Sequence, residues 1–136
     1  MAASSRPVST ADAAVAALAV AILVASVIPV PAATPRTDPT GSVATTTLLH
    51  LAGYATLAAV GVAAVVDDGW LGRLTTRRWV AVAAVIVAVA LFGVATELLQ
   101  GLVPWRTFSV AEMGLNAASA AVGGLLATMW FYRPVE

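Results

Sequence analysis

Four long runs of apolar residues, separated by short polar segments, dominate the sequence. The runs cover residues 12–31, 43–66, 79–103 and 110–132, and each contains only one Asp, Glu, His, Lys or Arg. A helix needs ~20 consecutive apolar residues to cross a bilayer core, so the pattern predicts four transmembrane helices. Connections this short join antiparallel neighbours. The predicted fold class is all-α, a single membrane domain over residues 1–136 built as a bundle of four transmembrane helices.

The first apolar run has a second interpretation, as a cleaved secretory signal peptide. Arg6 would then be its basic start, and the small residues at 30–32 its cleavage site. The apolar core of such signals is ~7–15 residues long, which is shorter than this run. We therefore expect the first helix to be retained.

Composition agrees with a membrane protein and excludes several other classes. Of the 136 residues, 60% are hydrophobic and 10% charged, a balance far from that of soluble domains. The net charge is zero, so no basic face predicts nucleic-acid binding, and the expected partner is the lipid bilayer. The absence of cysteine excludes disulfides, thiolate zinc sites and a cysteine nucleophile.

Arginine positions predict how the bundle is oriented. With four spans, one side of the membrane holds five arginines: Arg6, Arg73, Arg77, Arg78 and Arg133. The other side holds only Arg36 and Arg106. The positive-inside rule then predicts a multi-pass protein of the cell membrane with both termini in the cytoplasm.

Aromatic residues lie mostly near the ends of the apolar runs, where amphipathic rings anchor helices at the interface. This interpretation predicts interfacial positions for five of them: Tyr54, Trp70, Trp79, Trp105 and Trp130.

Polar side chains inside the predicted helices share one depth and one face per helix. With a rise of ~1.5 Å per residue, His50, Glu97 and Asn116 each lie ~9–10 Å below the same end of the bundle. Tyr54 falls ~40° from His50, and Gln100 ~60° from Glu97, around their helices. Burying these polar edges together would remove them from lipid.

The fourth run repeats the pattern and completes a predicted cluster. Its stripe consists of Glu112, Asn116, Ser119 and Gly123. Arg106, on the preceding loop, is placed to reach the cluster. The alternative is that these residues only hold the bundle together, with Arg106 paired to Glu97 or Glu112. Small residues spaced by four, such as Ser119 with Gly123, favour close helix packing in the same run.

The order and spacing of the polar residues resemble the VanZ-like family of small membrane proteins. The matching pattern is His50-x-x-x-Tyr54-x-x-Leu57, Glu97-x-x-Gln100, Pro104-x-Arg106-x-x-Ser109-x-x-Glu112-x-x-x-Asn116 and Gly123. The family usually has Asp at the position of Glu112 and commonly Gly at that of Ser119. A basic residue that often precedes the family's histidine is replaced here by the threonines at 45–47.

The resemblance implies where in the cell the protein acts, but not a chemical reaction. The founding member of that family is associated with tolerance of glycopeptide antibiotics, which implies a place in the cell envelope. We expect a cluster of His50, Tyr54, Glu97, Gln100, Arg106, Ser109, Glu112 and Asn116 that recognises or handles an envelope lipid or a lipid-linked glycan. Arginine suits such a site because its planar fork binds phosphate or carboxylate.

Two other functions are compatible with the sequence. A membrane-embedded enzyme would use a glutamate as general base and His50 as acid or metal ligand, although the sequence assigns no catalytic residue, metal ligand or cofactor. A non-catalytic subunit or assembly factor would use the polar residues only for packing. A transport channel would require oligomerisation, because four short helices enclose little space.

Overall fold

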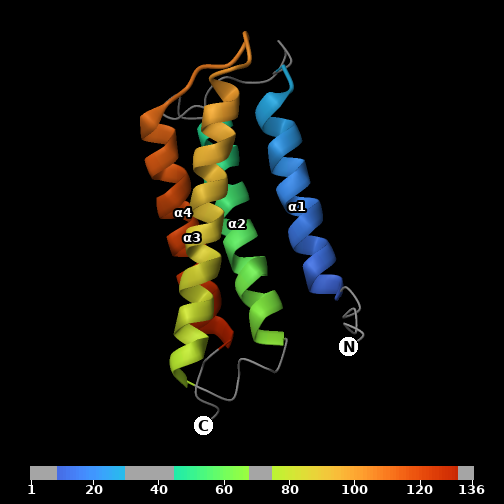
Figure 1. Cartoon of the computed structure of the whole chain (residues 1–136), viewed down its shortest axis with the longest axis vertical. Helices are drawn as coiled ribbons and strands as arrows, with labels where there is room; N and C mark the ends of the chain where they lie inside the picture. The colour runs from blue at the N-terminus through green and yellow to red at the C-terminus, as the bar shows by residue number, and fades with distance from the viewer. Residues whose placement is uncertain (1–8, 30–44, 68–74, 132–136) are drawn as a thin grey trace, which may run out of the picture.

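The computed structural model describes residues 9–29, 45–67 and 75–131, and this part of the chain is helical apart from its connections. It forms four helices: α1 (Thr10–Val27), α2 (Thr45–Asp67), α3 (Thr75–Gln100) and α4 (Val110–Phe131). They run alternately up and down, so α1 begins and α4 ends at the same end of the bundle (Figure 1). The all-α fold predicted from the apolar runs is confirmed.

Each of the four helices contains a segment long and apolar enough to cross a membrane. The outward surface of the bundle is also apolar: large side chains that are more than half exposed include Val80, Leu91, Leu126 and Met129. Apolar surface on this scale is stable against lipid and not against water. The chain is therefore a multi-pass membrane protein in contact with the lipid bilayer.

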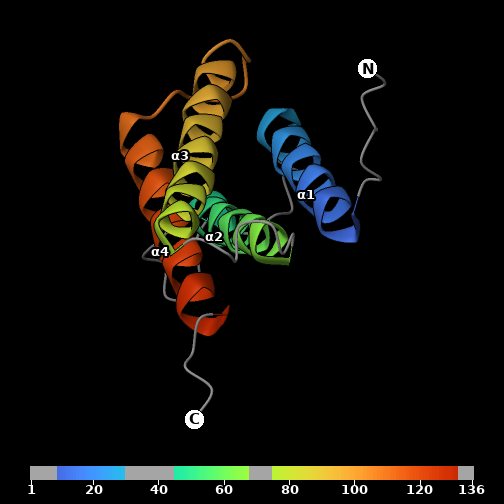
Figure 2. The ribbon, with the colours of Figure 1, turned by 60° about the horizontal axis from the view of Figure 1, so that its bottom comes forward.

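Helices α2, α3 and α4 form the tightly packed part of the bundle. α1 lies beside α2 and α3 and makes no contact with α4 within the described residues (Figure 2). One buried cluster contains Leu57 of α2, Val89 of α3 and Ala120 of α4, with Ile22 of α1 packed against it. The small residues Ala58 and Ala120 lie among larger ones in this cluster, and small residues of this kind let membrane helices approach closely.

Glycines permit close helix contacts, as Gly123 and Gly93 illustrate. A Cβ atom on Gly123 of α4 would overlap the backbone of Ala55 in α2, and one on Gly93 of α3 would lie 2.9 Å from Cβ of Asn116. Gly114, at the start of α4, faces open space. The contact between α2 and α4 therefore depends on Gly123, whereas Gly114 takes no part in packing.

Local chemistry explains where the helices begin and end. α1 starts at Thr10, earlier than expected, because Ser9 and Asp12 form a reciprocal capping box with two bonds of 3.1 Å. α3 ends at Gln100 rather than near Val103, since tighter turns follow it and Pro104 cannot continue a helix.

The middle connection is shorter than the predicted segment from Trp70 to Trp79, because α3 already begins at Thr75. Arg77 and Arg78 therefore belong to the start of α3. Several other residues used to predict orientation and anchoring lie outside the described residues: Arg6, Arg36, Trp70, Arg73 and Arg133.

Candidate functional site

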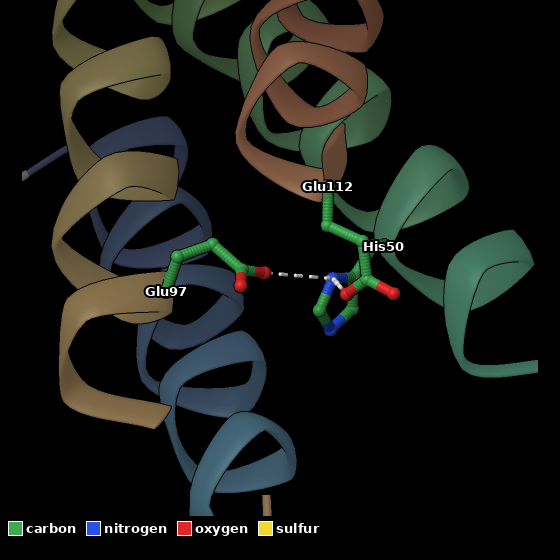
Figure 3. A group of neighbouring side chains, drawn as sticks. All are labelled: His50, Glu97 and Glu112. Carbon is green, nitrogen blue, oxygen red and sulfur yellow. Dashed lines mark ion pairs between the residues drawn. The ribbon is translucent and has the colours of Figure 1, made fainter. Parts of the chain in front are cut away.

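Three ionisable side chains from three helices meet near the end of the bundle that carries the connection between α3 and α4. Nδ1 of His50 in α2 lies 3.7 Å from Oε1 of Glu97 in α3 and 3.5 Å from Oε2 of Glu112 in α4. Both carboxylates point toward the imidazole ring (Figure 3). These three residues are called the His–Glu–Glu cluster below.

Most of this cluster is shielded from the surface. The side chain of Glu97 is 0% exposed and that of His50 12%, whereas Glu112 is 27% exposed. Neither Nδ1 of His50 nor Oε1 of Glu97 has a hydrogen-bond partner among the described residues. Two carboxylates and an imidazole thus face one another with two buried polar atoms unsatisfied, an arrangement that is expensive in an apolar interior.

Ser109 positions both glutamates. Its Oγ accepts a hydrogen bond of 3.2 Å from the backbone N–H of Glu112, so Ser109 caps α4. In a complete capping box, the Glu112 carboxylate would accept the Ser109 N–H in return. Here that N–H donates to Oε2 of Glu97 at 3.3 Å. Glu97 is held in place by this bond, and the Glu112 carboxylate is left to face His50.

Asn116 lies next to the cluster, one turn further along α4. It is fully buried, and neither of its amide atoms has a hydrogen bond of standard geometry among the described residues. Its side chain nevertheless lies close enough to Glu97 to interact with the carboxylate. The absent side chain of Gly93 makes room for it.

Tyr54 lies below the cluster, and its predicted interfacial position is wrong. The residue is 0% exposed, and its hydroxyl forms a buried hydrogen bond with Thr96 Oγ1. Its ring packs edge-on to that of His50, with centroids 6.0 Å apart. Trp79, Trp105 and Trp130 are instead more than half exposed, as expected for residues at helix ends. Tyr54 thus forms the inner boundary of the site.

Two of the predicted site residues turn toward α1. Nη2 of Arg106 donates to the backbone oxygens of Ala25 and Ile28, at 2.7 and 3.0 Å. Gln100 donates to the oxygen of Ser26 at 3.2 Å. These bonds cap the last carbonyls of α1, a helix that has no basic residue in its own last turn.

Trp105 completes this cap, because its Nε1 donates to the Val27 oxygen at 3.0 Å. The last residue of α3 and the connection after it therefore fix the end of α1 through three donor side chains. No ion pair joins Arg106 to Glu97 or Glu112 within the part of the chain that is described. Arg106 is still near enough to act electrostatically on His50.

Two residues with a role here were not singled out in the sequence, and a third was singled out only as an interfacial aromatic. Thr96 pairs with Tyr54, the backbone oxygen of the buried Ser26 accepts a hydrogen bond from Gln100, and Trp105 caps α1. Serine and threonine in a helix can donate their hydroxyl to a backbone oxygen of the same helix, as Thr96 does to Gly93 at 2.9 Å. The presence of Thr96 or Ser26 in the sequence therefore says little about a functional site.

Comparisons with known proteins add no family to this description. No protein-family model matches the chain, and neither the curated proteins nor the solved structures contain a match.

Proposed function

We propose that this is a VanZ-like protein of the cell envelope that recognises or handles an envelope lipid or a lipid-linked glycan at the His–Glu–Glu cluster. The observation that carries the proposal is the meeting of three ionisable side chains, with possible ligand atoms within 4.8 Å of one another, inside apolar spans. Groups this costly to place in hydrocarbon are usually retained for a function. Carboxylates and imidazole also suit the hydroxyls of a glycan, as hydrogen-bond acceptors and donors.

Arg106 supports an anionic part in that ligand. Its Nη2 is occupied by α1, but its Nε is buried and has no hydrogen-bond partner among the described residues. A phosphate or carboxylate oxygen would satisfy this N–H through a charge-assisted bond. Arg106 would then join the lipid anion to the end of α1.

The proposed ligand lies on the non-cytoplasmic side, which follows from the arginine distribution and the positive-inside rule. Because the chain has no cysteine, single cysteines can test this side directly. We expect Thr107→Cys, at an exposed position beside Arg106, to react in intact cells with a membrane-impermeant thiol reagent. Gly72→Cys should react only after the cells are opened. The reverse pattern would place the cluster toward the cytoplasm and exclude an outer-leaflet ligand.

Lipid retention tests recognition itself. The full chain would be extracted with its surrounding lipid in polymer nanodiscs, and the lipids identified by mass spectrometry. Arg106→Lys keeps a cation but lacks Nε and the planar fork. A lost charge-assisted bond is worth ~1.5–3 kcal/mol, so we expect at least ~10-fold less of the enriched lipid.

Ser119→Ala is the matched control for this experiment. The Ser119 hydroxyl already donates to the Leu115 backbone oxygen at 2.7 Å, within α4. Its loss should leave lipid retention unchanged. Equal retention by wild type and Arg106→Lys, or no enriched lipid in the wild type, would contradict the proposal.

A membrane-embedded enzyme is the second candidate, and one observation favours it. An imidazole nitrogen placed between two carboxylates is a group that can take up and release protons, as general acid–base catalysis requires. In that case, Glu112, the most exposed member of the cluster, is the residue closest to an incoming substrate.

A further inference from the structure

We propose that the His–Glu–Glu cluster binds a divalent metal ion, with zinc the best fit, through Nδ1 of His50, Oε1 of Glu97 and Oε2 of Glu112. The inference is independent of lipid recognition, since the ion can bind whether or not a lipid does. It rests on the distances within the cluster, on its unsatisfied atoms and on the residues that surround it.

The distances suit a bound ion better than hydrogen bonds. Nδ1 of His50 is 3.5 and 3.7 Å from the two carboxylate oxygens. Protein N–H···O bonds are ~2.7–3.2 Å long, so neither contact is one. Donor atoms around a tetrahedral zinc ion, bonded at ~2.0–2.2 Å, lie ~3.3–3.6 Å apart. The two distances from His50 are therefore close to those of a zinc coordination shell, and all three possible ligand atoms lie within 4.8 Å of one another, so a small inward shift of the carboxylates would complete the shell.

The charge and the burial of the cluster also favour a bound metal ion. Two carboxylates that face each other in an apolar interior repel when both are ionised, and a divalent cation between them would remove that repulsion. Glu97 is 0% exposed, and its Oε1, aimed at His50, has no hydrogen-bond partner in the described part of the chain (Figure 3). A metal ion would satisfy this oxygen and Nδ1 of His50 together.

The residues around the cluster resemble the outer shell of a metal site. The Ser109 N–H holds Oε2 of Glu97 and so directs Oε1 toward His50. Ligand carboxylates in metal sites are commonly fixed by such hydrogen bonds. Asn116, fully buried beside Glu97 and without a standard hydrogen bond among the described residues, can bond to a water or anion on the ion.

The donor set identifies the class of metal. One imidazole and two carboxylates suit zinc, whose catalytic sites have three protein ligands and an open fourth position. The fourth position would accept water or an oxygen of a bound phosphate or hydroxyl. Zinc would there act as a Lewis acid for that oxygen.

The test uses the full chain, purified in detergent through a tag without histidine and stripped with a chelator. We expect one zinc ion per chain in equilibrium binding, and cobalt substitution should give the visible absorption of a low-symmetry site. His50 is the single histidine in the sequence, so ¹⁵N-histidine NMR reports on one imidazole. Zinc should shift its Nδ1 resonance rather than that of Nε2.

Variants separate this site from adventitious binding. Glu112→Gln removes one ligand at a partly exposed position, where the substitution is compatible with folding. We expect its zinc Kd to rise at least ~100-fold, more than the loss of an outer-shell partner causes. Asp12→Asn removes an exposed carboxylate of α1 and should bind zinc like the wild type.

Two results would overturn the proposal. Absence of stoichiometric zinc and of any Nδ1 shift in the wild type would make the cluster a protonated, metal-free group. Equal zinc affinity of wild type and Glu112→Gln would put the ion elsewhere. Lipid retention is measured separately, so the failure of either proposal leaves the other open to its own test.

Discussion

Replacing Gly123 with alanine is expected to lower the free energy of unfolding of the bundle by roughly 1–3 kcal/mol, the usual cost of overpacking. The added Cβ atom would overlap the backbone of Ala55, and a backbone cannot rotate out of the way as a side chain can. α2 and α4 would have to separate, which would also move His50 relative to Glu112. Unfolding by SDS in mixed micelles, followed by circular dichroism, measures this change.

Two other glycines of α4, Gly124 and Gly114, provide comparisons for that result. A Cβ atom on Gly124 would approach the side-chain atoms of Ile86 to 2.6 and 3.0 Å, and a side chain can rotate away, so Gly124→Ala should cost less. Gly114 has nothing within 4 Å, so Gly114→Ala should cost nothing and favour the helix slightly. If Gly123→Ala unfolded at the same SDS fraction as Gly114→Ala, the close contact between α2 and α4 would be refuted.

Replacing Arg106 with alanine is expected to release the end of α1. The substitution removes both hydrogen bonds from Nη2 to Ala25 and Ile28. Hydrogen bonds from charged groups contribute ~1.5–3 kcal/mol, which corresponds to roughly 10–100-fold more frequent opening. A cysteine at Ser26, a side chain that is 1% exposed, would report this opening as faster reaction with a thiol reagent.

Three comparisons make the labelling experiment decisive. Thr107→Cys, at an exposed position, gives the rate of an accessible thiol in the native background. Arg106→Lys keeps a charged donor and should give an intermediate rate at Ser26→Cys. If Ser26→Cys reacts equally slowly with and without the Arg106→Ala substitution, Arg106 does not hold α1.

The fold was predictable because a membrane helix has to be apolar along its whole length. Depth predicted that His50, Glu97 and Asn116 would lie at one level, since antiparallel helices bring equal depths together. Glu112 was included because it shares a helix face with Asn116, one turn away. The exact ends of the helices were harder to predict. The start of α1 depends on a capping box at Ser9, and the end of α3 on turns that only the backbone bonds reveal.

The orientations of Arg106 and Tyr54 were not predictable, for related physical reasons. The partners of Arg106 are backbone oxygens of an apolar helix, and a carbonyl leaves no mark on the sequence. The partner of Tyr54 is Thr96, 42 residues away. Threonine side chains in helices often bond only to their own helix, so Thr96 gave no sign of this contact. From the sequence alone, a polar side chain near a helix end is therefore interpreted as interfacial unless its partner is known.

The cap on α1 also constrains how the protein is assembled. Its donors, Gln100, Trp105 and Arg106, follow their acceptors by 74 to 81 residues along the chain. During synthesis, α1 therefore enters the bilayer before the residues that bind its last carbonyls exist. These hydrogen bonds cannot form until α3 has inserted and its following loop has been made, whereas the packing of α1 against α2 can form earlier. The cap on α1, the earliest of the four helices in the chain, is thus completed late, at about the stage at which Glu112 arrives beside His50.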